Sequence, residues 1–255
     1  MNADGHRWGK GGVLGMLLLG MALGAVSVGT VSVGMGEAIA STPTRPTTQT
    51  RPLLPRPPRT PPPNRTRAGG SLGTEQTCGQ GDSDLMAILP EQNPVYTMLA
   101  QPTVLVYVPY GATEVQSAEF SVLVGIDETQ ALYRTRLDLP DAPGVVRITL
   151  PSEVAIAPNE FYHWYFKINC AGNTTRRADL TVDGWFQRLP ATPERQQQIT
   201  SGTPEIWYDA IAQIAQQLQQ TPADNRLKTQ WAALLQSVGA ERAIASPILE
   251  AEIAN

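Results

Sequence analysis

The chain has 255 residues, of which 42% are hydrophobic and 16% are charged, and its formal net charge is −4 at pH 7. The charges are separated along the chain, because residues 41–67 carry six arginines and no acid, whereas residues 68–255 carry 11 basic and 21 acidic residues. An acidic body lacks the basic face that binding to phosphate backbones requires, so nucleic acid is not an expected partner.

The N-terminal segment has the pattern of an export signal. Two basic residues precede an apolar run over residues 13–33, and Ala38 and Ala40 supply the small residues of a signal-peptidase site. We predict a signal peptide over residues 1–40, cleaved after Ala40, and hence a periplasmic or secreted protein. The alternative is an uncleaved membrane anchor, because the run is about long enough to cross a bilayer. Contact with the membrane is expected only in that case.

Residues 41–67 contain nine prolines and are predicted to form an Arg/Pro-rich disordered linker, because such a segment has almost nothing to bury. The favoured interpretation is a spacer that holds the folded body away from a membrane or wall. The alternatives are an arginine arm that binds an anionic partner, an arm that folds back on the acidic body, and a tether to the wall.

Residues 68–190 are predicted to form an antiparallel β-sandwich of the immunoglobulin-like kind. The predicted strands are residues 103–110, 119–127, 131–139, 145–150, 162–170 and 180–189. Short strands at a spacing of roughly ten residues, separated by turns rich in Pro, Gly and Asp, are typical of this architecture. The first of these strands, "TVLVYVPY", is apolar on both faces, which predicts a strand that is covered on both sides.

The strand "YHWYFKINC" at 162–170 places its large apolar side chains on one face. The residues predicted to form the structural core are Tyr162, Trp164, Phe166 and Ile168. Tyr162 also matches the position at which a sandwich tyrosine binds upstream backbone through its hydroxyl. His163 points to the opposite face from Cys170, which disfavours a Cys–His dyad within the strand.

Cys78 and Cys170 are the two cysteines of the chain, and in an oxidising compartment they are most simply paired as a disulfide. In the chain-entropy model such a bridge stabilises the fold by ~4 kcal/mol. The alternative is a catalytic thiol, for which no motif with a neighbouring base is present.

Residues 200–255 are predicted to form a C-terminal helical hairpin. "EIWYDAIAQIAQQLQQ" and "RLKTQWAALLQSVG" both carry apolar residues at helical spacing, and "TPADN" separates them. We expect the apolar stripes to pack on the sandwich, and the alternative is a surface for docking a partner.

The sequence contains none of the standard catalytic arrangements. It has no nucleophile elbow, phosphate-binding loop or dinucleotide motif, and His163 is the one histidine that follows the signal segment. Asp82 and Asp84 are a weak alternative for calcium. We predict no catalytic, cofactor-binding or metal-binding residues and no cofactor. An exposed tryptophan can stack on a sugar ring, and Trp185 is the candidate for such a role if it lies on the surface.

Several motifs, in their order along the chain, resemble the family of domain of unknown function 928, which is known mainly from cyanobacteria. They are "PTVLVYVPY", "PGVVRITLP", "YHWYFKINC", "VDGWFQRL", "IWYDAIAQIA" and "WAALLQSVG". The resemblance covers most of residues 70–250 and implies an exported cyanobacterial envelope protein in which the two cysteines are a shared feature. The family usually has an arginine after the glycine-serine that precedes the first cysteine, and this chain has Leu72 there, which puts any basic role at that position in doubt. The resemblance supplies no catalytic residues.

The sequence therefore predicts an exported envelope protein that acts as a non-enzymatic binding or adaptor module. Its partner would be an envelope protein or polymer that the sequence does not identify. The alternative is a hydrolase of envelope polysaccharide or peptide that uses an unrecognised pair of carboxylates.

Overall fold

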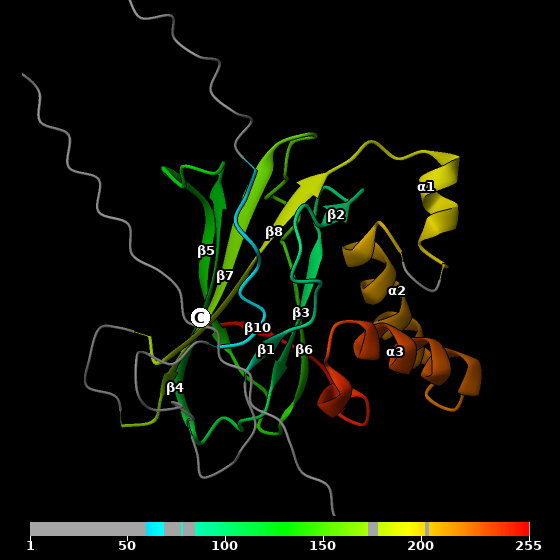
Figure 1. Ribbon diagram of the computed structural model, residues 1–255. Helices are drawn as coiled ribbons and strands as arrows, with labels where there is room; N and C mark the ends of the chain where they lie inside the picture. Colours follow the sequence, from blue (N-terminus) through cyan, green and yellow to red (C-terminus); the bar gives the residue numbers. More distant parts are fainter. Residues whose placement is uncertain (1–59, 69–77, 79–84, 173–177, 202–203, 255) are drawn as a thin grey trace, which may run out of the picture. The chain divides into compact units, whose positions relative to one another are not determined.

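The computed structural model describes residues 60–68, 78, 85–172, 178–201 and 204–254. The predicted signal peptide and residues 41–59 of the predicted linker lie outside these ranges. In the described part, the chain is mainly β and forms two sheets with three α-helices beside them (Figure 1). None of the helices there is both long and apolar enough to cross a bilayer.

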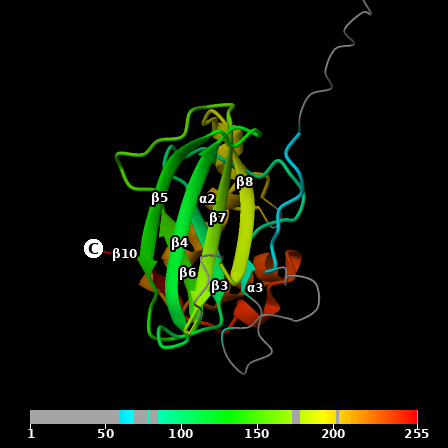
Figure 2. The same cartoon turned by 90° about the vertical axis from the view of Figure 1, so that its left-hand side faces the viewer.

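Each of the two sheets combines long neighbouring strands with short strands from distant parts of the chain. The smaller sheet has the order β1 (Met86–Ala87), β3 (Thr103–Val108), β6 (Gly144–Thr149), β9 (Ile248–Glu250). The larger sheet has the order β10 (Glu252–Ile253), β5 (Gln130–Asp138), β4 (Val115–Val124), β7 (Phe161–Cys170), β8 (Leu180–Arg188), β2 (Tyr96–Thr97). The larger sheet is visibly curved (Figure 2).

The prediction of a mainly β protein is confirmed, but both sheets are mixed. β9 runs parallel to β6, and β2 runs parallel to β8. The long strands pair antiparallel, as the hydrophobic alternation and the turns predict. The parallel pairs arise because residues far away in the sequence add short strands at the sheet edges, and no strictly antiparallel, immunoglobulin-like sandwich is confirmed.

The core lies between the two sheets. Trp164, Phe166 and Ile168 of β7 are fully buried there, and Tyr162 is 4% exposed. Ala157 N donates a hydrogen bond to Tyr162 Oη at 2.9 Å, the upstream backbone contact that the sequence predicts for this tyrosine. All six residues of β3 are buried, because the larger sheet lies on one side of this strand and α2 on the other (Figure 1).

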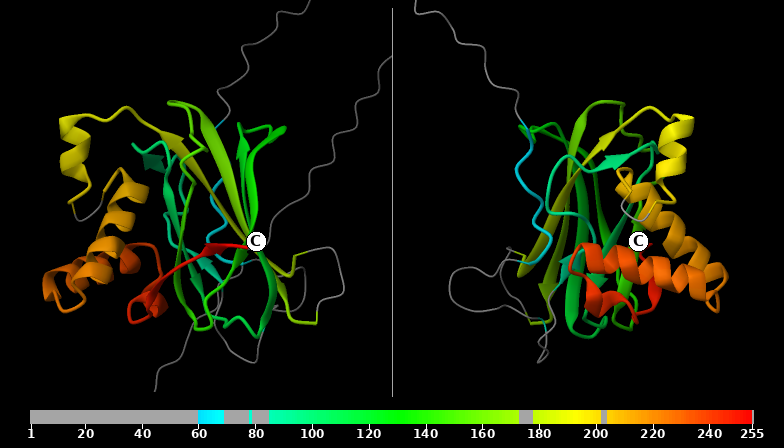
Figure 3. Two further views of the ribbon diagram at one scale, coloured as in Figure 1. Left: turned by 180° about the vertical axis from the view of Figure 1, so that it is seen from behind. Right: turned by 45° about the vertical axis from the view of Figure 1, so that its right-hand side comes forward.

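The helices follow β8 in the chain and lie on the outer side of the smaller sheet (Figure 3). They are α1 (Pro193–Gln198), α2 (Trp207–Gln220) and α3 (Asn225–Ser237), and a short 3-10 helix, η1 (Glu241–Ala243), follows them. α2 and α3 correspond to the two predicted helices, whereas α1 was not predicted. After η1 the chain returns to both sheets as β9 and β10, so residues 200–255 as a whole do not form the predicted helical hairpin.

Two buried polar residues of α2 fix this helix against the larger sheet. Tyr208 Oη accepts a hydrogen bond from Trp164 Nε1 at 2.8 Å and donates one to the Trp185 carbonyl at 2.9 Å, and burial raises the pKa of Tyr208. The Asp209 carboxylate accepts hydrogen bonds from Thr97 Oγ1 at 2.5 Å and from Met98 N at 2.9 Å. Burial raises the pKa of Asp209, because removal from water disfavours the charged form.

The predicted disulfide between Cys78 and Cys170 is confirmed, and it joins positions that are 92 residues apart. Cys170 is the last residue of β7, and Cys78 precedes β1 in the chain. The bridge therefore connects the end of a central strand of the larger sheet to the segment that leads into the smaller sheet.

Residues 60–67, which we call the strap, cover the edge of β8. Asp183 N donates to the Arg65 carbonyl at 3.0 Å, and Trp185 N donates to Asn64 Oδ1 at 2.8 Å. On the other side, Ala87 N donates to the Thr66 carbonyl at 2.7 Å, which attaches the strap to β1 of the smaller sheet. The folded body thus begins before Ala68, within the segment predicted as linker (Figure 2).

Candidate functional site

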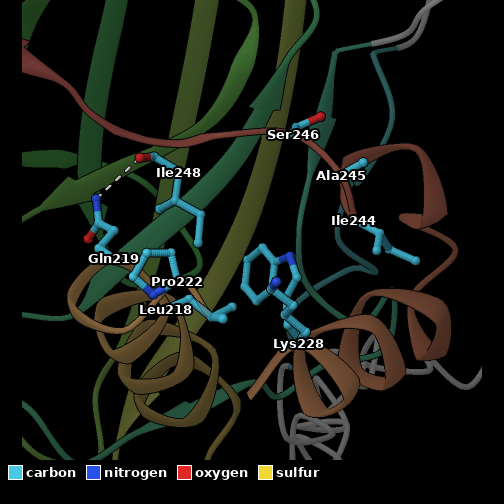
Figure 4. A pocket seen from close by; sticks show the side chains of 9 residues that line it. Leu218, Gln219, Pro222, Lys228, Ile244, Ala245, Ser246 and Ile248 are labelled. Carbon is cyan, nitrogen blue, oxygen red and sulfur yellow. Dashed lines mark hydrogen bonds between the residues drawn. The ribbon is translucent and has the colours of Figure 1, made fainter. Parts of the chain in front are cut away.

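A concave pocket of about 630 Å³ lies where α2 ends, α3 begins and the chain returns towards β9 (Figure 4). Its walls are mostly apolar, and Gln219, Lys228 and Ser246 contribute polar groups to them. The lining residues are Leu218, Gln219, Pro222, Lys228, Trp231, Ile244, Ala245, Ser246 and Ile248. They come from three separate segments, which the fold brings together.

The local sequence explains how the pocket forms. Pro222 ends the helical stretch after α2, and Asp224 then accepts hydrogen bonds from Arg226 N and Leu227 N to start α3 in a new direction. Gln219 Nε2 donates to the Ile248 carbonyl at 3.2 Å, which connects the end of α2 to the returning chain (Figure 4). The pocket is the space left between these connections.

The pocket combines apolar walls with one charged side chain. Trp231 is 3% exposed, and Leu218, Ile244 and Ile248 are half-buried, so the walls offer apolar contact area. The Lys228 ammonium adds a positive charge. None of the lining residues is a histidine, cysteine, aspartate or glutamate, and Ser246 and Lys228 are the lining residues of types that can serve as nucleophile and base.

A second group of polar residues surrounds His163 on the outer face of the larger sheet. His163 Nδ1 lies 2.5 Å from Glu128 Oε1, and His163 Nε2 lies 3.0 Å from Asp183 Oδ2. The imidazole stacks on the ring of Trp185 with 4.0 Å between centroids. Glu128 is placed by the turn between β4 and β5, and the other residues come from β7 and β8.

The polar groups around His163 form a buried hydrogen-bonded network. Both ring nitrogens face carboxylate oxygens, which hold the imidazole in one orientation. Tyr165 Oη donates to Glu128 Oε2 at 2.9 Å. Burial raises the pKa of Tyr165, and the hydrogen bond to Glu128 and its negative charge act in the same direction.

Access to this cluster is limited. His163 and Asp183 are each 5% exposed, and Arg65 N of the strap donates to Asp183 Oδ2 at 3.4 Å. A hydrolase would need two carboxylates that face a substrate across a groove. Glu128 and Asp183 instead contact the same histidine from opposite sides.

The structure places the other residues discussed from the sequence as follows. Trp185 is 1% exposed, so it offers no platform for a sugar. Asn64 of the strap is 6% exposed, and its amide also donates to the Pro90 carbonyl at 2.7 Å. His163 and Cys170 lie on opposite faces of β7, and Cys170 is in the disulfide. Leu72, Asp82 and Asp84 lie outside the described residues, among which no group of three potential ligands could hold a metal ion.

Sequence reasoning missed both the pocket and the partners of His163. The pocket depends on how three segments pack, and apolar residues at helical spacing do not distinguish a pocket wall from a core. The contact between His163 and Asp183 depends on strand register, since β7 and β8 place His163 opposite Trp185 and Tyr165 opposite Asp183. The available signal was "VDGWFQ", in which a period of two places Asp183 and Trp185 on the same face of the strand.

A comparison with protein families gives a match for this chain. The model of the family described as Domain of Unknown Function (DUF928) matches residues 66–248, which is more than half of the chain. The chain belongs to the DUF928 family. The DUF928 match includes the disulfide, the cluster around His163 and the whole lining of the pocket. No curated protein and no solved structure gives a significant match.

Proposed function

We propose that this protein is an exported binding or adaptor module of the cell envelope, without catalytic activity, and that the pocket beside α2 and α3 is its recognition site. The single observation that carries the proposal is the composition of that pocket. It is concave and largely apolar, and none of its lining residues is a histidine, cysteine, aspartate or glutamate.

The occupant that the pocket fits is an apolar side chain presented by a partner protein. The volume of about 630 Å³ exceeds what one side chain fills, which leaves space for the flanking main chain of the partner. The Ser246 hydroxyl can accept a hydrogen bond from such a main chain, whereas the Gln219 amide already binds Arg147, Ile248 and Glu250. Lys228 favours a partner with an acidic residue beside the apolar one.

Export is supported by the sequence pattern of residues 1–40 and by the disulfide, because such bridges persist in oxidising compartments. We further propose a cleaved signal peptide, a periplasmic or secreted location and a cyanobacterial host. For the fold, we keep the immunoglobulin-like relationship as a proposal, supported by the hydroxyl contact of Tyr162, and the hairpin of α2 and α3 as its C-terminal addition.

The recognition site is tested by filling it. Ala245→Trp places an indole in the pocket, and Ala155→Trp adds the same group at an exposed position between β6 and β7. Peptides selected from a random library on the native protein should bind Ala155→Trp unchanged and should lose binding to Ala245→Trp. Equal binding to both variants, with denaturation midpoints unchanged, would show that the pocket is not the recognition site.

Location and activity need separate measurements. The intact mass of the protein from its host's envelope should lack residues 1–40 and be two hydrogens short of the reduced form, because of the Cys78–Cys170 bridge. A full-length mass would instead support the membrane anchor. Release of soluble product from isolated cell wall by the purified protein would contradict a non-enzymatic role.

A further inference from the structure

The larger sheet ends in an edge that is only partly covered. β10 pairs with β5 at two positions, Glu252 with Asp138 and Ile253 with Leu137. The described chain places no strand beside the remainder of β5, from Gln130 to Thr135. Uncovered strands present main-chain donors and acceptors to which another extended segment can bind.

The hydrogen-bond pattern shows which main-chain groups face this edge. Ala254 N donates to the Arg136 carbonyl at 3.1 Å, so the main chain of Arg136 faces the β10 side. Because main-chain direction alternates along a strand, the N–H and C=O of Arg134 face the same side, beyond the point where β10 covers it. The register shift between Val122 and Leu123 then ends the regular part of the edge.

The side chains at this edge are basic, although the body as a whole is acidic. Arg134 and Arg136 are exposed, and both occupy the outer face, where they lie opposite Ser121 and Glu119 of β4. The contact of Arg134 with Glu119, 3.8 Å between Nε and Oε1, is solvent-exposed and therefore weak. A hollow of about 420 Å³, which Arg136 also lines, lies beside the same edge.

Charge decides which occupant fits. A second copy that paired through its own β5 would bring Arg134 and Arg136 close to the same residues of its neighbour, which is unfavourable across strands. Residues 41–59 of the chain are rich in arginine and proline, so they offer neither opposite charge nor a regular set of N–H donors. An extended segment with acidic side chains satisfies both the main chain and the arginines.

We propose that the free edge of β5, centred on Arg134, binds an extended acidic segment of a partner protein as an added strand. This surface is separate from the pocket and would give the protein a second point of attachment. Main-chain hydrogen bonds supply the affinity in this mode, and the side chains that alternate along the segment supply the selectivity.

The proposal is tested with synthetic peptides and the full chain. The probe is an extended peptide in which glutamate alternates with valine, and its binding is measured by fluorescence anisotropy. The matched probes carry lysine in place of glutamate, or N-methyl groups on alternate amides that remove the donors of the ladder. The acidic peptide should bind, and both matched probes should bind about tenfold more weakly or worse. Absence of binding by the acidic peptide, or equal binding by the N-methylated one, would overturn the proposal.

Variants of one residue separate the main-chain contribution from the charge. Arg134→Ala keeps the N–H and should weaken binding of the acidic peptide by less than Arg134→Pro, which removes both the charge and the N–H that faces the edge. Ala245→Trp, which fills the pocket, should leave binding of this peptide unchanged. Loss of binding in Ala245→Trp would mean that the peptide occupies the pocket, and equal affinities of the proline and alanine variants would exclude an added strand. If Arg134→Pro does not fold, the N-methylated peptide still decides the question.

Discussion

The two edges of the larger sheet are completed in different ways. At the β8 edge, β2 and the strap occupy the side of the strand, and buried polar side chains hold the strap in place. At the β5 edge, β10 pairs with two residues, and the exposed Arg134 and Arg136 lie in the part of β5 beyond this pairing. A sheet edge can be protected from unwanted pairing by cover or by charge, and this protein uses one solution on each side.

The two edges should differ most in their contribution to the free energy of unfolding when one carboxylate is removed from each of them. Asp183→Ala at the covered edge leaves His163 Nε2 and Arg65 N without their buried hydrogen-bond partner, and we expect a loss of about 2–3 kcal/mol in the free energy of unfolding. Glu119→Ala near the open edge removes only the exposed contact with Arg134 and should cost less than about 1 kcal/mol. Urea denaturation measures both, and losses of equal size would show that the edges are not differently built.

The disulfide should stabilise the β8 edge locally and should have no local effect on the β5 edge. Cys78 lies in the chain between the strap and β1, so replacement of both cysteines by serine should cost about 2–4 kcal/mol. Hydrogen exchange at Asn64 N and Ala68 N should become faster, while exchange at Ala254 N should change only with global stability. Uniform acceleration at both edges would contradict a local role of the bridge.

Single side chains of the strap and of β5 provide a smaller contrast. Asn64→Ala leaves Trp185 N and the Pro90 carbonyl without their partner, and we expect a destabilisation of about 1–2 kcal/mol. Gln130→Ala changes an exposed side chain at the open edge and should remain within about 0.5 kcal/mol of the parent. A neutral Asn64→Ala would mean that the strap does not hold the β8 edge.

The smallest effect concerns pH. Asp209 holds Thr97 of β2, which completes the covered edge, and burial raises its pKa above the ordinary value of 3.8. The folded state therefore binds more protons than the unfolded state, and this contribution to stability is full below pH 3.8 and is lost as the pH rises through the folded-state pKa. The free energy of unfolding of the parent minus that of Asp209→Asn should decrease with rising pH. An increase would show that hydrogen bonds to the ionised carboxylate dominate over burial.

The central strands could be predicted because their pattern is local. Alternation along β7 identified Tyr162 and Trp164 as inward-facing, and the continuous apolar run of β3 indicated a strand covered on both sides. The observed bounds of α2 and α3 differ by one or two residues from the helical periodicity. In these elements the residues that determine the structure are close together in the sequence.

The edges could not be predicted in this way. The strap is rich in proline and has no apolar pattern, and it is held by contacts with β8 across about 120 positions, such as the bond between Asn64 and Trp185. β9 and β10 have three and two residues, which is too short for a period to be recognised. The pocket has the same origin, because the wall that contains Ile244 and Ser246 is set by where the chain returns to β9.

The path of residues 248–254 has a consequence for the timing of folding. β9 completes the smaller sheet and β10 adds to the larger one, so a single short stretch joins both sheets after nearly all other elements have been made. A ribosome-bound chain that stops before residue 248 would leave one edge of β6 and the last two residues of β5 without a neighbouring strand. Final assembly of the two sheets is thus delayed until synthesis has passed this stretch.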